Sequence, residues 1–404
     1  MASSLPLFPP TRDAGLARLS QFAPRAGSAY AAGRNSDGGP GADTAVSRLS
    51  PYLRYRLVSE REVVAAVLSR HSLPAAEKFV QEVLWRTYWK GWLEMRPVVW
   101  SRFLEERERQ SEALVDARAL ADAENGTTGI EGFDDWAREL VTTGYLHNHA
   151  RMWFASIWIF TLGLPWTLGA DFFLRHLVDA DAASNTLSWR WVAGLQTVGK
   201  TYLATADNIA RYTDGRFAPK GLAEEAAALV EALVEAPVGP AQPLPRLVPS
   251  AADVPSLLLV TQEDLHPETG LLADPPTAAA LVVGDPGLLW GEGARAFVAA
   301  AAADAAARVA EQSSCPASTA HSLDVGTVVA AAQAAGVRQI ATPYAPVGPV
   351  ADALAALSPV LAQEGIVLAQ MRRDWDERFW PRAGKGFFAF REHIPALLRE
   401  EGLS

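Results

Sequence analysis

The hydrophobic pattern of this 404-residue chain changes at a proline-rich stretch, and that change restricts the folds that the chain can adopt. From residue 46 to about residue 212, apolar side chains recur at three- and four-residue spacings, which is typical of amphipathic helices. Residues 236–250, APVGPAQPLPRLVPS, concentrate proline, which neither a helix interior nor a central strand tolerates. The sequence therefore predicts a domain boundary at this stretch, with a helical domain before it.

After the boundary, short apolar runs alternate with alanine-rich helical patterns. Strands are predicted at 256–260, 279–283, 339–343 and 365–371, and helices near 293–311 and 348–363. Continuous apolar strands separated by helices indicate a parallel sheet covered on both faces. We therefore expect an all-α domain followed by an α/β domain with a Rossmann-like parallel sheet.

The predicted organisation has four parts. They are an irregular N-terminal segment rich in Pro, Gly, Ala and Ser at 1–45, a helical domain at 46–235, a linker at 236–252 and an α/β domain at 253–404. The helical domain is expected to end with one more helix at 221–233.

The charge of the chain limits its partners. The net charge is −10, which argues at first sight against nucleic acid, because affinity for DNA depends on Lys and Arg. Residues 1–220, however, hold 25 Lys and Arg against 24 Asp and Glu, so the acidity lies in the remaining part. A basic face on the helical domain stays open beside an ordinary solvated surface. Its candidates are Arg48, Arg54, Arg56, Arg61, Arg86, Arg151, Arg190 and Lys200.

Cysteine use and hydropathy bear on the compartment. The one cysteine, Cys315, cannot form an internal disulfide, which fits a reducing environment. No stretch of sequence is long and apolar enough for a membrane span, and the first ten residues lack the basic start of a signal peptide. We expect a cytoplasmic protein with no membrane partner.

Tryptophan is concentrated in the predicted helical domain, where ten of the thirteen lie between Trp85 and Trp191. Core packing explains most of them, but several stand beside charged or amide side chains. Asp181 and Asn185 are one helical turn apart, so they could cap a helix or hold the polar edge of a ligand.

The segment HNHAR at 147–151 also concentrates polar side chains. It could form a buried hydrogen-bonded cluster without a ligand. No metal site is expected, because His147 and His149 are two residues apart, which on a helix points them in different directions.

Four segments in order, SRLSPYL at 47–53, QEVLWR at 81–86, TGYLHNHARM at 143–152 and DADAASNTLSWRW at 179–191, resemble the successive flavin-domain motifs of the DNA photolyase and cryptochrome family. The resemblance implies a helical domain that holds FAD non-covalently in a folded conformation. It also implies a lyase that repairs cyclobutane pyrimidine dimers in DNA, in which light drives an electron from reduced FAD to the dimer.

The resemblance assigns residues to the cofactor. Those implied to hold FAD are Tyr30, Ser47, Arg48, Leu49, Ser50, Arg86, Asn148, Arg151, Phe173, Asp179, Asp181 and Asn185. Arg86 and Arg151 would pair with cofactor phosphates or with the buried aspartates of the family. Asp179 and Asp181 would hold the ribityl chain and ring edge, and Asn185 would face flavin N5.

The resemblance also assigns residues to the lesion and to electron transfer. Those implied to border a flipped dimer are Glu82, Trp85, Asn148, His149, Met152 and Trp191, and those implied to act in the reaction are Glu82, Asn185, Trp166 and Trp189. In the tryptophan relay, Trp189 resembles the member nearest the flavin and Trp166 the middle one. Residues 101–135 contain no Trp or Tyr, so the outer member would be Trp136, Trp153, Trp158 or another residue. A purely structural role for Trp189 stays an alternative.

The chain departs from the family pattern in two ways. Segments 256–270 and 380–398 resemble parts of the family's α/β antenna domain, which is expected here after the flavin domain, and the sequence does not identify a second antenna chromophore. Thr87 stands where the family commonly has a carboxylate, and His149 where an arginine often lies near DNA. Leu187 and Ser188 stand where Gly or Asn usually precedes the tryptophan, and these differences concern the DNA-facing surface more than the flavin pocket.

These departures leave alternatives open. One is a cryptochrome-like blue-light photoreceptor without repair activity, and another is a flavoprotein acting on a different small substrate. We expect damaged DNA as the partner, single- or double-stranded, and a monomeric protein without metal.

Overall fold

The computed structural model describes residues 7–42, 44–113, 116–229, 238–269, 276–313 and 315–403. The chain forms two compact units. The first, which we call the sheet unit, comprises Met1–Pro24, Arg48–Met95 and Ala241–Ser404, and the second, the helical unit, comprises Arg25–Ser47 and Arg96–Pro240. No helix in the described ranges is long and apolar enough to cross a bilayer.

The sheet unit contains a five-stranded sheet in the order β3-β2-β1-β4-β5, and the paired strands are parallel. The strands are β1 (Ser256–Thr261), β2 (Thr277–Val283), β3 (Ala317–Ala320), β4 (Gln339–Pro343) and β5 (Val367–Met371). The helices of this unit are α1 (Arg12–Phe22), α3 (Ser50–Arg54), α4 (Glu60–Leu68), α5 (Leu73–Glu94), α13 (Glu292–Ser313), α14 (Val325–Ala334), α15 (Pro349–Gln363), α16 (Asp374–Phe379) and α17 (Phe387–Glu400), with 3-10 turns η3 (Pro286–Leu288) and η4 (Trp380–Arg382).

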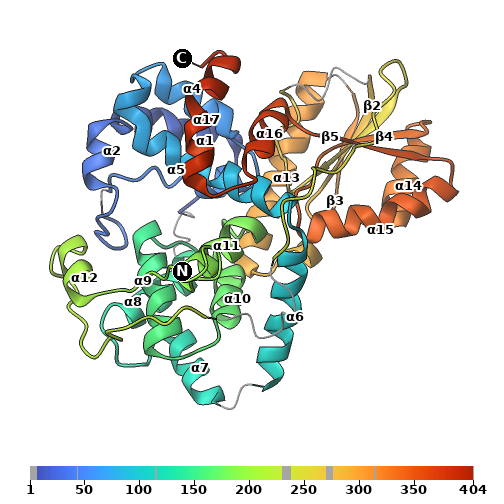
Figure 1. Ribbon diagram of the computed structural model, residues 1–404. Coiled ribbons are helices and arrows are strands. Elements are labelled where there is room, and N and C mark those ends of the chain that lie inside the picture. Colours follow the sequence, from blue (N-terminus) through green and yellow to red (C-terminus); the bar gives the residue numbers. More distant parts are fainter. Residues whose placement is uncertain are drawn as a thin grey trace, which may run out of the picture. The chain divides into compact units, whose positions relative to one another are not determined.

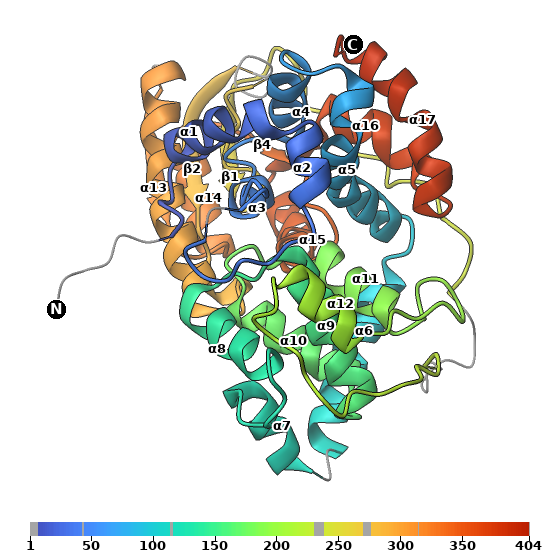
Figure 2. The same cartoon turned by 90° about the vertical axis from the view of Figure 1, so that its left-hand side faces the viewer.

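Helices cover both faces of this sheet (Figures 1 and 2). Because side chains alternate along a strand, Leu257 and Leu259 of β1 point to one face, where they pack in one core with Leu354 of α15 and Val328 of α14. On the other face α13 packs against β2 and β3. The central strand β1 is buried along its whole length, as expected for a parallel sheet between two helical layers.

The helical unit consists of short helices around an aromatic core. They are α2 (Ser28–Gly33), α6 (Val98–Ala113), α7 (Ala117–Asn125), α8 (Phe133–Thr143), α9 (Asn148–Ser156), α10 (Trp166–His176), α11 (Ala182–Val192) and α12 (Ala206–Tyr212), with the π-helical turn η2 (Ile157–Thr161). The 3-10 turn η1 (Ala23–Arg25) includes the last residues of the first segment of the sheet unit and the first residue of the helical unit. Helices α9, α10 and α11 lie side by side in both views (Figures 1 and 2). Ring pairs such as Phe133–Phe154, with centroids 4.3 Å apart, fill the space between helices.

The predicted fold class is confirmed: a helical region precedes an α/β region with a parallel sheet. The predicted strands and the helices near 293–311 and 348–363 are all present. Contacts divide the chain differently from the predicted domains of 46–235 and 253–404, because residues 48–95 pack within the sheet unit. Of the predicted linker at 236–252, residues 236 and 237 lie outside the described residues. Residues 238–252 form no helix or strand.

Several local predictions are wrong. The segment 1–45, predicted to be irregular, contains α1 and α2 within its described residues, 7–42 and 44–45. The prediction followed the Pro-, Gly-, Ala- and Ser-rich composition and did not use the capping residue of α1. Thr11 caps this helix by accepting a hydrogen bond from the Ala14 N–H at 3.2 Å. Strand β3 and helix α14 were missed, because the small residues of β3 make no apolar run.

The helix predicted at 221–233 is not found at 221–229, and 230–233 lie outside the described residues. The backbone of this segment bonds to other parts of the helical unit: the Leu229 N–H donates to the Ala193 carbonyl at 3.1 Å, and the Ala226 carbonyl accepts from the Thr201 hydroxyl at 3.1 Å. These tertiary hydrogen bonds override the helix propensity of the alanine-rich sequence.

Three of the arginines considered as candidates for a basic face do not lie on the surface. Arg54, Arg56 and Arg190 are buried, with 3 or 4% of their surface exposed. Arg54 makes two hydrogen bonds to the Glu263 carboxylate, at 2.7 and 2.8 Å. These guanidinium groups are therefore structural, and they are not available to phosphates.

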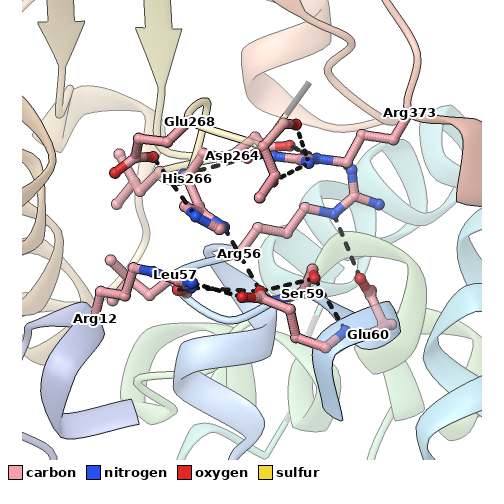
Figure 3. Close-up of polar contacts among 12 residues, drawn as sticks. Arg12, Arg56, Leu57, Ser59, Glu60, Asp264, His266, Glu268 and Arg373 are labelled. Carbon is pink, nitrogen blue, oxygen red and sulfur yellow. Dashed lines mark hydrogen bonds and ion pairs between the residues drawn. The ribbon is translucent and has the colours of Figure 1, made fainter. Parts of the chain in front are cut away.

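Arg56 lies at the centre of a buried ionic cluster in the sheet unit (Figure 3). It donates to both oxygens of the Asp376 carboxylate at 2.7 Å and forms ion pairs with Asp264 at 3.5 Å and Glu60 at 3.6 Å. Asp264 also accepts two hydrogen bonds from Arg373, at 2.5 and 2.8 Å. The cluster joins the residues before α4, the loop after β1 and helix α16.

His266 extends this cluster toward Glu62 and Glu268 (Figure 3). Its Nδ1 lies 3.6 Å from a Glu62 oxygen, and its Nε2 lies 3.9 Å from a Glu268 oxygen. Burial, reinforced by the positive charge of Arg12, lowers the pKa of His266 to about 4. The folded protein therefore keeps this imidazole neutral at pH values where an unfolded chain would protonate it.

We expect the free energy of unfolding to decrease as the pH falls from 6.5 toward 4. In this window the unfolded state binds the His266 proton and the folded state does not, so stability is lost with acidity, by up to about 1.4 kcal/mol per pH unit for one proton. Substitution H266Q should flatten this slope, whereas H321Q, at an exposed histidine of the same unit, should not. Urea denaturation at several pH values measures both slopes, and equal slopes for H266Q and the wild type would contradict the prediction.

Candidate functional site

The N-terminus of α11 holds two of the predicted cofactor residues. Asp181 caps the helix, since its carboxylate accepts a hydrogen bond from the Ser184 N–H at 2.8 Å. Asn185 follows one turn later and donates from its side-chain amide to the Ala170 carbonyl of α10 at 2.9 Å. Both side chains are buried, with 3% and 8% of their surface exposed. The helix cap accounts for one hydrogen bond of the Asp181 carboxylate. The Asp181 carboxylate and the Asn185 amide lie on the same buried helical turn.

Asp179 precedes α11 and is paired with a residue of α9. The Arg151 guanidinium donates to the Asp179 carboxylate at 3.1 Å and to the Leu146 carbonyl at 3.0 Å, and it lies 5.5 Å from the centre of the Tyr145 ring. Asp179 is 4% exposed, so an opposite charge is needed to keep a carboxylate there ionised. Of the two partners predicted for Arg151, phosphate or buried aspartate, the structure shows an aspartate.

Trp189 forms the aromatic wall of this region. Its ring makes edge contacts with Phe173, with centroids 5.1 Å apart, and with Trp158, at 6.2 Å. A Cβ atom added at Gly169 would lie 2.3 Å from the Trp189 ring, so glycine is required for the close approach of α10 and α11. The sequence predicted Trp158 as one candidate for the outer member of the relay. The periodicity of the sequence could not have revealed its contact with Trp189.

Three side chains of α11 carry buried polar atoms that have no hydrogen-bond partner among the described residues: the hydroxyls of Ser184 and Thr186 and the indole N–H of Trp189. Buried polar groups are nearly always paired in folded proteins. Ser184 and Thr186 are two residues apart and point to different sides of α11, so these atoms do not mark one site. The buried carboxylates of Asp179 and Asp181 and the amide of Asn185, beside the aromatic rings, are the groups that suit a polar ring-bearing ligand. The residues of this region therefore fit a flavin nucleotide.

The HNHAR segment is mostly internal. The His147 ring caps α9 by accepting from the His149 N–H at 3.2 Å, and the His149 ring lies 3.0 Å from the Asn35 carbonyl and 3.3 Å from the Tyr202 hydroxyl. Burial lowers the pKa of His149. This is the hydrogen-bonded cluster considered from the sequence, whereas Asn148 is exposed and Met152 is half-buried.

The tryptophans predicted to form a relay make ring contacts in which Trp158, a candidate for the outer member, is next to Trp189. Trp189 contacts Trp158, whose indole donates to the Pro165 carbonyl at 3.0 Å. Trp166 follows Pro165, is half-buried, and makes its one ring contact within the described residues with Phe103, at 5.7 Å. Trp191 is also half-buried and stacks on Tyr202 at 5.7 Å.

The remaining predicted cofactor residues are divided between the units. Tyr30, on α2, and Ser47 belong to the helical unit, and Arg48, Leu49, Ser50 and Arg86 belong to the sheet unit. Arg48 has a φ of 51°, in the left-handed region that a non-glycine residue adopts infrequently. The residue after it, Leu49, is completely buried.

Helix α5 of the sheet unit carries the predicted lesion contacts Glu82 and Trp85, both half-buried. One face of the Trp85 ring is covered by Phe387 of α17, with centroids 3.5 Å apart and planes within 10°. The buried Thr87 hydroxyl accepts a hydrogen bond from the Trp375 indole at 3.1 Å. Thr87, where the resemblance implies a carboxylate, therefore takes part in the packing inside the sheet unit.

These features define a class of protein: a helical unit with buried carboxylates, an amide and aromatic walls, suited to a polar ring-bearing cofactor. Residues 79–218 match the family model described as the FAD binding domain of DNA photolyase. The similarity to that domain covers this stretch of the chain.

The chain is similar to curated deoxyribodipyrimidine photo-lyases. It is 39% identical to the one from Streptomyces griseus over 157 residues, which are 39% of this chain and 34% of that protein. It is 36% identical to one from Thermus thermophilus over 197 residues, which are 47% of this chain and 44% of that protein. The chain thus spans less than half the length of these relatives. A bacterial class III photolyase from Agrobacterium tumefaciens superposes with a TM-score of 0.45 and 28% identity, over 52% of this chain and 44% of that one.

We expect G169A to destabilise the protein, although alanine usually stabilises a helix relative to glycine by about 0.5–1 kcal/mol. The added methyl group would overlap the Trp189 ring, and overpacking of this kind costs about 1–3 kcal/mol. In a W189L background the same substitution should cost less, because the clashing ring is gone. Denaturant unfolding of the wild type, G169A, W189L and the double variant measures the free energy of unfolding in this double-mutant cycle. An equal loss of stability from G169A in both backgrounds would rule out the contact with Trp189 as the cause.

Proposed function

We propose that the helical unit binds FAD non-covalently and that the protein uses it for light-driven repair of cyclobutane pyrimidine dimers in DNA. The observation that carries the proposal is the buried group of Arg151, Asp179, Asp181 and Asn185 beside Trp189, inside the stretch that matches the FAD-binding family model. The names of the curated relatives support the same activity. The single, buried Cys315 supports a reducing compartment such as the cytoplasm.

The cofactor role follows from the chemistry of these side chains. Carboxylates of Asp179 and Asp181 accept hydrogen bonds from the hydroxyls of a ribityl chain and from a ring N–H. Arg151 pairs with the Asp179 carboxylate and fixes its position. Asn185 carries both a donor and an acceptor, and Phe173 provides an apolar wall. From the resemblance we also propose Tyr30, Ser47, Arg48, Leu49, Ser50, Arg86 and Asn148 as cofactor contacts.

Bound in its reduced form, FAD would supply the electron that light makes available to the dimer. The chain's own residues would hold the lesion. Photolyases are among the enzymes that take a target base out of the duplex, which requires apolar walls in place of the lost stacking. From the resemblance we propose that Trp85 and Trp191 provide such walls, that the Glu82 carboxyl grips the pyrimidine edge, and that Met152, Asn148 and His149 also border the lesion. Because His149 is buried, its role would be to position its neighbours.

We further propose Trp189, Trp158 and Trp166 as the order of the relay that reduces the cofactor. Trp158 contacts the ring of Trp189 and donates to the carbonyl before Trp166, which reaches the surface. In W189F and in W158F, photoreduction under blue light with an external reductant should slow at least about tenfold, while W153F, within the same aromatic core, should leave the rate unchanged. Absorbance during illumination measures the rate, and unaltered photoreduction in W158F would exclude it from the relay.

A second candidate function is light sensing without turnover. Two observations favour it: His149 is buried where the family exposes a residue to DNA, and Thr87 is engaged by Trp375. Such a photoreceptor would reduce its flavin in light and change its partner binding or oligomeric state, with no product formed.

Repair and cofactor binding can be tested separately on the purified full chain. We expect a flavin absorption band, a lower flavin content in D179N, and no change in D207N, at an exposed aspartate of the same unit. After reduction and illumination, the wild type should restore pyrimidines in a dimer-containing oligonucleotide. E82A should repair about 10- to 100-fold more slowly through loss of a charged hydrogen bond, and E77A on the same helix should repair normally. A colourless protein contradicts the whole proposal, whereas flavin without repair favours the photoreceptor.

A further inference from the structure

We propose that the N-terminal end of α17 is a second DNA contact, in which Phe388 stacks on an unpaired base while Arg382, Lys385 and Arg391 hold the phosphates of the same strand. We call these four residues the α17 surface. They lie outside residues 79–218, the stretch that matches the FAD-binding family model. That the bound strand is damaged DNA rests on the proposed function, but contact with single-stranded DNA does not.

Phe388 is held on the surface by its neighbours. It is 73% exposed, and no other aromatic side chain is prominent among the exposed large apolar residues of the described chain. The preceding residue, Phe387, is buried and stacks flat on Trp85, and the Tyr88 hydroxyl donates to the Lys385 carbonyl at 2.9 Å. These contacts anchor the start of α17 on α5 (Figures 1 and 2), so the exposed Phe388 is carried by a helix end that is fixed in place.

The charge around Phe388 is positive in an acidic part of the chain. Residues 381–391 contain three cations and no acid, the exposed Glu392 follows them, and the chain as a whole carries −10. Arg382, Lys385 and Arg391 are exposed, and within the described residues none of them has an ion-pair partner. Other arginines of the same unit, such as Arg54 and Arg373, are bound to carboxylates. These three cations are therefore available to an anionic partner.

An exposed ring with a cation above it and further cations beside it fits single-stranded nucleic acid. The Arg391 guanidinium carbon lies 5.4 Å from the centre of the Phe388 ring. Proteins that bind single strands combine aromatic stacking platforms with positive groups that follow the phosphates. The α17 surface has both parts, and the residue before Phe388, the buried Phe387, stacks on Trp85, the proposed lesion wall. A strand displaced next to a flipped dimer supplies the unpaired bases that this surface would bind.

The test is fluorescence anisotropy of the full-length protein with a labelled, undamaged single-stranded oligonucleotide. We expect F388A to weaken binding about 5- to 100-fold with the salt dependence unchanged, because stacking is lost and no phosphate contact is removed. K385A and R391A should each weaken binding and reduce the slope of log affinity against log salt by about 0.7. V367A, at another exposed apolar residue, and R399A, at the far end of α17, are the matched controls and should bind normally.

Wild-type affinity in F388A and in the cation variants would overturn the proposal, even if repair activity is found. Conversely, a colourless protein would refute the flavin-dependent function, while a Phe388-dependent affinity for single strands would still support the α17 surface. Binding to phosphatidylserine vesicles that depends on Phe388, together with no binding to DNA, would assign this surface to a membrane and overturn the proposal.

Discussion

The sheet unit depends on how it neutralises the buried Arg56 guanidinium. Burial acts to lower the pKa of Arg56, but the carboxylates of Asp376, Glu60 and Asp264 outweigh it and raise the pKa, so the cation is retained. Removing one partner from a buried ion pair leaves an uncompensated charge, which costs about 3–5 kcal/mol. Arg56 also adopts a φ of 49°, so the surrounding contacts hold a strained backbone. Three segments far apart in sequence are thereby fixed around one charge.

The sequence predicted the apolar part of the fold well and the ionic part poorly. Strands such as 256–260 are runs of apolar residues, and a run of this kind has few alternatives to a buried strand. Arg54 and Arg56 were interpreted as candidates for a surface, because charged residues are seldom buried without a partner. Their partners, Glu263 and Asp376, lie more than 200 residues away, and no local pattern connects them. Strand β3 was missed for a related reason, since an edge strand of small residues is defined by its neighbour.

In the candidate site, the sequence identified residues but not their partners. The spacing of Asp181 and Asn185 indicated one shared helical turn, which the structure shows. Whether Arg151 faces phosphate or aspartate could not be decided, because the answer depends on the approach of α9 to the loop before α11. The contact between Trp158 and Trp189 depends on Gly169, whose missing side chain lets two helices approach closely. Such complementarity is a property of packing and leaves no periodic signal.

The stack of Phe387 on Trp85 also constrains any base that Trp85 receives. A ring pair 3.5 Å apart leaves no space for a third ring on the shared side, so a flipped base could stack only on the opposite face of Trp85. In return, the stack stiffens the Trp85 side chain before a ligand arrives, which lowers the entropy lost on binding. Because Phe387 comes from α17, the trailing segment of the chain preorganises a residue of the family-matched stretch.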